Sequence, residues 1–192
     1  MSLRIIACGI FQDALSFLEI DKVRPDVHVT FLSPYLHNQP CELEKELLSH
    51  IDQARRKKEK IICIYGHCLP NMDDLLEGQN VRRIEGQHCY QMLLGAEAFQ
   101  NIMNEDAGTY FLEKQLICHF DEYCKQPLEL DDTEMKRDYF RHYRRILYIR
   151  QPRDADLLPQ CLEIARFLGL KLQVRDADYG ELRTNLLKLI FE

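Results

Sequence analysis

Four residues whose side chains bind metals or act as nucleophiles each come just past a short apolar run of the chain. They are Cys8, His37, Cys68 and Cys89. If the apolar runs are parallel strands, their carboxyl ends meet at one edge of a sheet, which is where open α/β folds bind ligands. The positions therefore predict that three thiols and one imidazole gather at a single site.

Three cysteines and one histidine form a known zinc-binding set, and thiolates also hold iron–sulfur clusters. The sequence contains no CxxC pair, so it matches neither a zinc ribbon nor a ferredoxin-type cluster motif. Successive strand ends can nevertheless bring ligands together from separate elements. We therefore expect Cys8, Cys68 and Cys89 to be thiolate ligands of zinc or of a 4Fe–4S cluster, with His37 or an exogenous ligand completing the set.

The same segments also permit an interpretation as reactive thiols. His67 and His88 immediately precede Cys68 and Cys89. A neighbouring imidazolium or a helix N-terminus lowers the pKa of a thiol and makes it a nucleophile. Glycines near the site cysteines, at positions 9, 66 and 86, indicate tight turns or close approach of a ligand to the backbone.

A purely structural interpretation stands beside both. Cysteine behaves as a small hydrophobe and is often buried without function, which we expect for Cys63 in the third strand and Cys161 in a helix. On this interpretation His37 is only a loop residue, followed by Asn38 as the cap of the next helix and Pro40 in its first turn.

Short apolar runs alternate with amphipathic helical segments along the chain. The expected strands of the sheet cover residues 3–7, 27–32, 60–65, 81–84, 145–149 and 171–175, and a further strand at 109–112 begins an inserted segment. Several of them lack polar alternation, which is typical of strands buried on both faces of a parallel sheet. We expect an α/β fold with a single doubly wound, mostly parallel sheet of five or six strands, Rossmann-like or flavodoxin-like. Residues 1–192 would form one domain, with an inserted helical segment at roughly 109–142.

Composition narrows the classes of function. The chain has 192 residues with 25 basic and 31 acidic side chains, so we expect no nucleic-acid partner, although KRDYFRHYRR over 136–145 mixes basic and aromatic residues. There is no signal-peptide pattern and no membrane-spanning apolar run, so we expect a cytoplasmic protein whose eight cysteines are reduced. Neither GxxxxGK(S/T) nor GxGxxG is present, so no motif indicates a bound nucleotide.

Several ordered motifs carry a resemblance to a known family. IACG stands near the start of the chain, LHNQP follows the second expected strand, and YGHC follows the third. After them come, in order, a GxxC segment followed by MLLG, and then GTYFL, RILYI and FLGL. In this order the chain resembles the uncharacterised family named domain of unknown function 1638. The resemblance covers almost the whole chain.

The resemblance implies surroundings rather than a reaction. Members of that family occur in anaerobic bacteria and methanogenic archaea and are often encoded near corrinoid-dependent methyltransferase systems. The family cysteines match Cys8, Cys68 and Cys89, and its LHN histidine matches His37. The chain departs from the family where LPNMDDL replaces a glycine-rich continuation and where Gln-His-Cys replaces His-Asp-Cys, so the family histidine of that motif has no counterpart at position 87.

Our leading hypothesis is a metal- or cluster-binding accessory protein of anaerobic corrinoid-dependent methyl transfer. Three thiolates with one open position suit substrate or corrinoid binding better than a structural role. Its partners would be a corrinoid protein or a methyltransferase, as the resemblance implies. The alternatives are an enzyme that uses a thiol directly, such as a methyltransferase with a thiol acceptor, and a metal-free protein-binding scaffold.

Overall fold

The computed structural model describes residues 2–192 and contains seven strands in two parallel sheets. All seven strands lie where the sequence predicts them: β1 Leu3–Cys8, β2 Val27–Leu32, β3 Lys60–Ile64, β4 Arg82–Arg83, β5 Thr109–Leu112, β6 Arg145–Arg150 and β7 Lys171–Asp176. The prediction of a single sheet of five or six strands is wrong. The strands form one sheet of four, in the order β2-β1-β3-β4, and one of three, in the order β5-β6-β7.

Contacts between residues divide the chain into two compact units. Unit 1 consists of residues 1–95 and 179–192, and unit 2 of residues 96–178. The physical reason for two sheets is that β5 pairs with β6 and not with β4, which leaves β4 at the edge of the first sheet with only two residues. The expectation of one domain over residues 1–192 stays a prediction, because compact units can belong to one folding domain.

Unit 1 has a core built on two buried strands. β1 is buried except at Arg4, which is half-buried. The Arg4 guanidinium donates hydrogen bonds to the Glu59 carboxylate and, at 3.0 Å, to Thr30 Oγ1. β3 is buried throughout after Lys60. β2 has exposed positions because it lies at the sheet edge, where only one neighbour covers it. The predicted burial on both faces therefore holds for the central strands β1 and β3 and does not hold for the edge strand β2.

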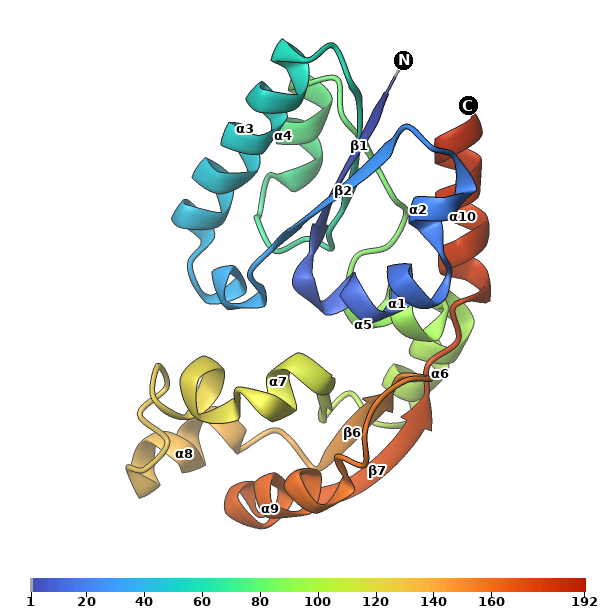
Figure 1. Cartoon of the computed structure of the whole chain (residues 1–192). Helices are drawn as coiled ribbons and strands as arrows, with labels where there is room; N and C mark the ends of the chain where they lie inside the picture. The colour runs from blue at the N-terminus through green and yellow to red at the C-terminus, as the bar shows by residue number, and fades with distance from the viewer. Residues whose placement is uncertain (1) are drawn as a thin grey trace. The chain divides into compact units, whose positions relative to one another are not determined.

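Helices surround the first sheet. They are η1 Gly9–Phe11, α1 Gln12–Phe17, α2 Ile20–Val23, η2 Pro34–Asn38, α3 Pro40–Arg56, α4 Met72–Gly78, α5 Cys89–Leu94 and α10 Gly180–Phe191. In Figure 1, α3 and α4 lie on one side of the sheet and α10 lies on the other. α3 buries Leu43, Leu47 and Ile51, which share one helical face, and has Pro40 in its first turn. Its N-cap is Gln39 and not Asn38, because η2 continues through Asn38.

Unit 2 packs helices against the second sheet. They are α6 Ala96–Glu105, α7 Lys114–Cys118, the π-helix η3 Asp121–Lys125, α8 Thr133–Phe140 and α9 Leu158–Leu168. Its core contains Leu112, Ile146, Tyr148 and Leu130. α9 ends at Gly169, which adopts the left-handed conformation with φ of 70° that favours glycine. The segment at 109–142 begins with β5 and continues through α7, η3 and α8.

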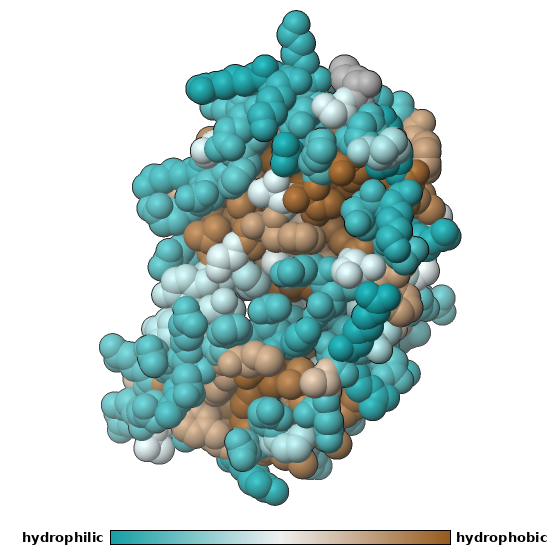
Figure 2. All heavy atoms as spheres, in the orientation of Figure 1, coloured by the Kyte–Doolittle hydropathy of each residue, from teal (hydrophilic) through white to brown (hydrophobic). Residues whose placement is uncertain are grey.

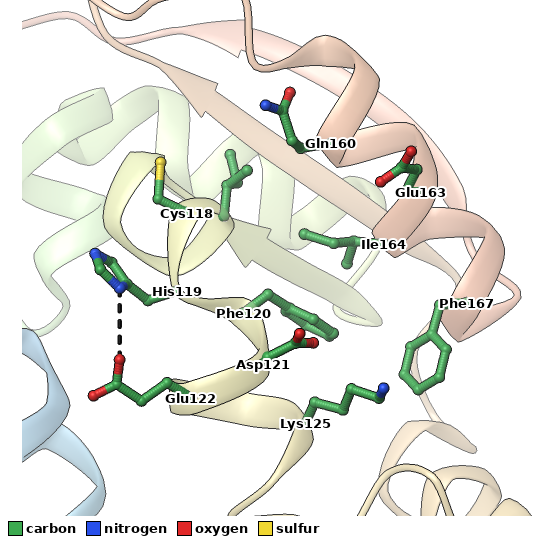
Figure 3. A pocket seen from close by; sticks show the side chains of 11 residues that line it. Cys118, His119, Phe120, Asp121, Glu122, Lys125, Gln160, Glu163, Ile164 and Phe167 are labelled. Atoms are coloured by element: carbon green, nitrogen blue, oxygen red, sulfur yellow. Dashed lines mark ion pairs between the residues drawn. The ribbon is translucent and has the colours of Figure 1, made fainter.

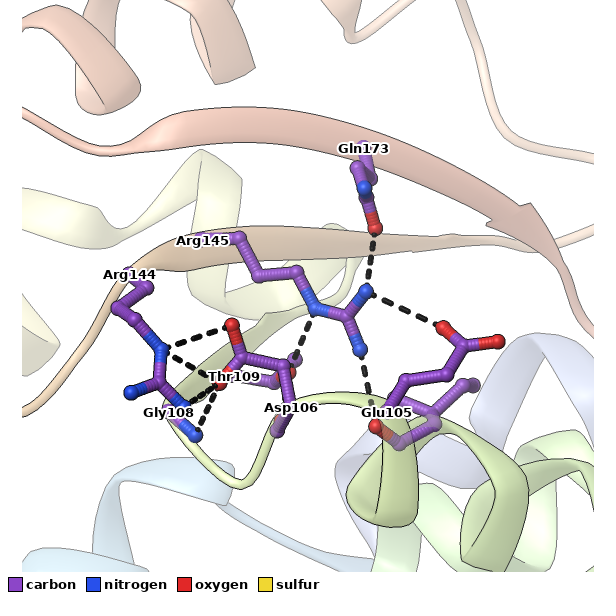
Figure 4. A network of polar contacts seen from close by, with 8 residues as sticks. Glu105, Asp106, Gly108, Thr109, Arg144, Arg145 and Gln173 are labelled. Atoms are coloured by element: carbon purple, nitrogen blue, oxygen red, sulfur yellow. Dashed lines mark hydrogen bonds and ion pairs between the residues drawn. The ribbon is translucent and has the colours of Figure 1, made fainter.

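Two arginines of the basic stretch hold unit 2 together (Figure 4). Arg145 Nε donates to Thr109 Oγ1 at 2.8 Å and Arg145 Nη1 donates to Gln173 Oε1 at 2.9 Å, which joins β5, β6 and β7. Arg144 pairs with Asp106, with Nε 2.9 Å from Oδ1. Both arginines are therefore engaged within the unit.

None of the helices in residues 2–192 has the length and hydropathy that crossing a bilayer requires.

Candidate functional site

The four predicted residues lie at the carboxyl edge of the first sheet. Cys8 is the last residue of β1, His37 belongs to η2 after β2, Cys68 lies in the loop after β3, and Cys89 is the first residue of α5 after β4. In the sheet order β2-β1-β3-β4, the chain adds β2 on one side of β1 and then β3 and β4 on the other, so the direction of strand addition changes between β1 and β3. Ligands in open α/β sheets bind in the crevice at such a reversal. Cys8 and the loop containing Cys68 stand on its two sides.

Two glycines allow the loops of the site to approach one another. A Cβ on Gly9 would lie 2.8 Å from Pro34 Cδ, so the loop after β1 packs directly on the start of η2. A Cβ on Gly66 would lie 2.8 Å from the Gln87 carbonyl oxygen and 3.0 Å from the Cys89 amide nitrogen. At Gly9 and Gly66 the close approach is between loops of the protein itself, and close approach of a ligand to these glycines stays a prediction.

The side chains of the four residues form a continuous chain of contacts. The side chains of His37 and Cys68, of Cys68 and Cys89, and of Cys89 and Cys8 lie close enough to affect one another's pKa values. The Gly66 amide also donates to Cys89 Sγ at 3.4 Å. Cys8 is buried, Cys68 and Cys89 are half-buried, and His37 is exposed. The contacts thus run from the surface at His37 inward to Cys8.

The surroundings of Cys68 and Cys89 favour the neutral thiols, because they raise the pKa of each. The hydrogen bond with Cys89 raises the pKa of Cys68, burial raises it further, and contact with His37 opposes both. For Cys89 the bond with Cys68 lowers the pKa, but the bond with Cys8 and burial outweigh it, so the pKa is raised. The bond with Cys68 raises the pKa of His37. The expectation of lowered pKa values for these thiols is therefore wrong, because thiol neighbours and burial dominate.

His67 pairs with an aspartate and an arginine of unit 1. His67 Nε2 lies 2.8 Å from Asp73 Oδ2, and Arg83 Nη2 lies 3.0 Å from the same imidazole nitrogen. His88 occupies the N-cap position of α5. His37, which comes from a different loop, is a neighbour of the Cys68 thiol.

Arg83 joins the loops that contain Cys68 and Cys89. Its Nη1 donates to the carbonyl oxygens of Tyr65 at 3.0 Å and Gly86 at 2.7 Å, and its Nε donates to Asp73 Oδ1 at 2.7 Å. A guanidinium has five donors in a fixed planar arrangement, so one side chain can hold several carbonyl groups at once. Arg83 was not among the residues predicted from the sequence. The pair of arginines, Arg82 and Arg83, between the apolar Val81 and Ile84 is the signal that could have drawn attention to it.

Tyr65 was also missed, and it lies at the inner wall of the site. Its side chain is 2% exposed. Within residues 2–192 its hydroxyl oxygen has no hydrogen-bond partner. Burial raises the pKa of Tyr65, and charge on Cys8, Cys63, Cys89 and Cys68 would raise it further. The hydroxyl therefore stays protonated.

Other cysteines occupy structural positions. Cys63 and Cys161 are each 0% exposed, and burial raises the pKa of each to about 12. Cys124 Sγ lies 3.1 Å from Tyr110 Oη in the core of unit 2. All eight cysteines are free thiols. The structural interpretation therefore accounts for Cys63 and Cys161.

The donor types at the site suit a thiophilic metal, but the arrangement is a chain and not a closed cluster. In the described part of the chain, no group of three or more His, Cys, Asp or Glu residues is already arranged to hold a metal ion. The thiols would have to turn toward a common centre to coordinate one. As they stand, they can relay protons, react with an electrophile that enters past His37, or close around an ion.

Unit 2 contains a separate cavity of about 380 Å³ between α7, η3 and α9 (Figure 3). Figure 2 shows apolar atoms gathered on the surface over this part of unit 2. Lys125 and Lys136 place their ammonium groups 5.3 and 4.2 Å from the centre of the Phe167 ring, and His119 Nδ1 lies 3.6 Å from Glu122 Oε2. His119, Glu122 and Lys125 of its lining thus already have partners within the unit, and we regard the sulfur edge of unit 1 as the stronger candidate site.

Comparison with known proteins bears on the resemblance seen in the sequence. A family model described as "Protein of unknown function (DUF1638)" matches residues 31–186, which confirms that resemblance. His37, Cys68 and Cys89 lie within the matched range and Cys8 precedes it. No curated protein and no solved structure matches the chain.

Proposed function

Since this chain belongs to the family of proteins of unknown function DUF1638, we propose a function from its own site: Cys8, Cys68 and Cys89 bind a thiophilic metal ion or an iron–sulfur cluster. The observation that carries the proposal is the unbroken line of contacts from His37 through the three sulfurs, at the carboxyl edge of a parallel sheet. Three thiolates and an imidazole suit zinc, and thiolates alone suit a 4Fe–4S cluster.

Binding requires the sulfurs to converge. The thiols of Cys68 and Cys89, and those of Cys89 and Cys8, are neighbours that act on one another's pKa values, and metal binding would require all three to turn toward one centre. Metal binding also displaces the thiol protons. Cys68 and Cys89 have raised pKa values, and neutral thiols are poor nucleophiles. A bound metal cation would supply the positive charge that stabilises their thiolates. This combination favours a metal centre over a free reactive thiolate.

Within this proposal, three thiolates leave one position for His37 or an exogenous ligand. His37 is exposed, so a ligand entering from solvent can displace it. An open position of this kind suits an accessory protein of corrinoid-dependent methyl transfer, with a corrinoid protein or a methyltransferase as partner. That part of the proposal rests on the surroundings of the family and not on the geometry.

A second candidate is an enzyme that uses Cys68 directly as a methyl acceptor. The contact between His37 and Cys68 favours it, because a thiol beside an imidazole is the usual pair for thiol nucleophiles. His37 would take the thiol proton while the Cys68 sulfur forms a bond to the methyl carbon and the bond from that carbon to its donor breaks. In this case Cys89 and Cys8 would take no part in the reaction.

Metal analysis of variants purified without oxygen tests the proposal. Wild-type protein is expected to contain about one metal site per chain, and Cys68→Ser is expected to lose it. Cys161→Ala is the matched control, because that thiol is buried in the core of unit 2. Equal metal content in both variants would contradict the proposal. A metal-free protein in which Cys68 alone is alkylated rapidly, and in which His37→Ala slows the alkylation, would favour the second candidate.

A further inference from the structure

Strand β7 leaves one edge of the second sheet without a neighbour. In the order β5-β6-β7 it pairs only with β6, and five of its six residues are exposed. The Ala177 amide donates to the Arg150 carbonyl oxygen of β6. Because backbone groups alternate in direction along a strand, the amides and carbonyls of Leu172, Val174 and Asp176 point away from β6. Within residues 2–192 these three residues make no backbone hydrogen bond to any other element.

Exposed apolar side chains lie beside this free edge. Leu172 packs against the core of unit 2, to which α9 belongs, and Val174 lies on the same face of the strand because it is two residues further along. Phe167 of α9 lines the cavity beside α7, and Leu158 lies about two and a half helical turns earlier, on the opposite side of the helix. Leu162 follows Leu158 by one turn. Since α9 packs on both α7 and β7 (Figure 1), the side away from α7 is the one at the free edge. Val174, Leu158 and Leu162 are all exposed there.

The charges of β7 match a second, antiparallel copy of the same strand. With Val174 opposite Val174 of the second copy, Arg175 lies opposite the neutral Gln173 and Lys171 lies opposite Ala177. Sliding the strands by two residues in one direction places Lys171 opposite Arg175. Sliding them in the other direction places Arg175 opposite itself. Like charges directly opposite one another destabilise a strand pair, so the charges favour the register centred on Val174.

We propose that two copies of this chain associate through β7, antiparallel about a two-fold axis at Val174, so that two three-stranded sheets become one continuous sheet. The outward amides and carbonyls of each β7 then pair with those of the other copy. Val174, with Leu158 and Leu162 of α9, loses water at the same interface. The partner is a second copy and not an unrelated strand, because the charges that set the register are those of β7 itself. This inference is independent of the proposed metal site.

Analytical ultracentrifugation of the full chain over a range of concentrations tests this inference. A reducing buffer prevents the exposed Cys41 and Cys118 from cross-linking the copies. Wild-type protein is expected to sediment as a dimer of the 22.8 kDa chain. Val174→Lys and Val174→Glu should each dimerise at least about tenfold more weakly, because two like charges then meet at the axis. An equimolar mixture of the two variants should form dimers again, since opposite charges face each other in the mixed pair.

Phe31→Lys is the matched control, because Phe31 is an exposed apolar residue of β2, an edge strand of the first sheet. This variant should dimerise as wild-type protein does. A monomeric wild-type protein, or a Val174→Lys protein as dimeric as wild-type, overturns the inference. Dissociation by Phe31→Lys alone also overturns it, because the interface then lies on β2. A mixture that stays monomeric refutes the pairing at Val174. If circular dichroism shows that the Val174 variants do not fold, Leu162→Lys decides: it should weaken the dimer, and an unchanged dimer overturns the inference.

Discussion

Replacing Gly66 with alanine tests the loop packing that builds the site. The new Cβ would lie 2.8 Å from the Gln87 carbonyl oxygen, 3.0 Å from the Cys89 amide nitrogen and 3.0 Å from His88 Cα. All three are backbone atoms, so the loops must move apart by about 0.5 Å to restore ordinary contact. Overpacking of this kind costs about 1–3 kcal/mol, and we expect Gly66→Ala to lower the free energy of unfolding by that amount.

Gly78→Ala is the matched control for this variant. Gly78 is the last residue of α4, and a Cβ there would have no atom within 4 Å. Alanine in a helix is favoured over glycine by about 0.5–1 kcal/mol, so this variant should be slightly more stable than wild-type protein. Opposite signs are therefore expected for the same substitution at two positions of unit 1.

Urea unfolding followed by far-UV circular dichroism measures both changes. Hydrogen–deuterium exchange of peptides that span β1 and β3 assigns the changes to unit 1, to which both strands belong. If Gly66→Ala is as stable as wild-type protein, the loops of Cys68 and Cys89 do not pack as described. A destabilised Gly78→Ala would show that the cost comes from alanine in general and not from the contact between the loops.

Three further predictions concern single side chains. Arg83→Met should lower the free energy of unfolding by about 1.5–3 kcal/mol, because hydrogen bonds from a charged group to the loop carbonyls are lost. Hydrogen exchange over residues 65–68 and 85–89 should become faster. Glu113→Ala should lower the stability of unit 2 by about 1–2 kcal/mol in urea unfolding, since the Glu113 carboxylate caps α7. Arg144 holds the pKa of Asp106 below its usual range. This ion pair therefore stabilises the protein at neutral pH and is lost as the pH falls through that lowered pKa, so the difference between wild-type protein and Asp106→Asn should shrink in acid.

The sequence predicted the strands well because each is a short apolar run bounded by polar residues. It could not predict that they form two sheets, since pairing between strands is not encoded in the apolar pattern of either strand. β4 shows the difficulty: only Arg82 and Arg83 pair in a run expected to extend over 81–84. The sheet therefore ends there, and β5 begins a second one.

The candidate site was partly predictable for a related reason. In parallel strands, residues that follow strand ends lie at one edge, so the gathering of Cys8, His37, Cys68 and Cys89 could be expected from their positions alone. Their role as metal ligands stays a prediction. Tyr65 and Arg83 could not be found in this way, because a buried hydroxyl without a partner and a guanidinium between two loops are properties of the packing.

X-ray absorption spectroscopy at the metal edge, on protein purified without oxygen, tests the central claim most directly. The claim is that Cys8, Cys68 and Cys89 coordinate one thiophilic centre. For zinc, it predicts sulfur neighbours at about 2.3 Å, three per metal, with one lighter ligand at about 2.0 Å. A protein with no bound metal, or a metal surrounded only by nitrogen and oxygen, would contradict it.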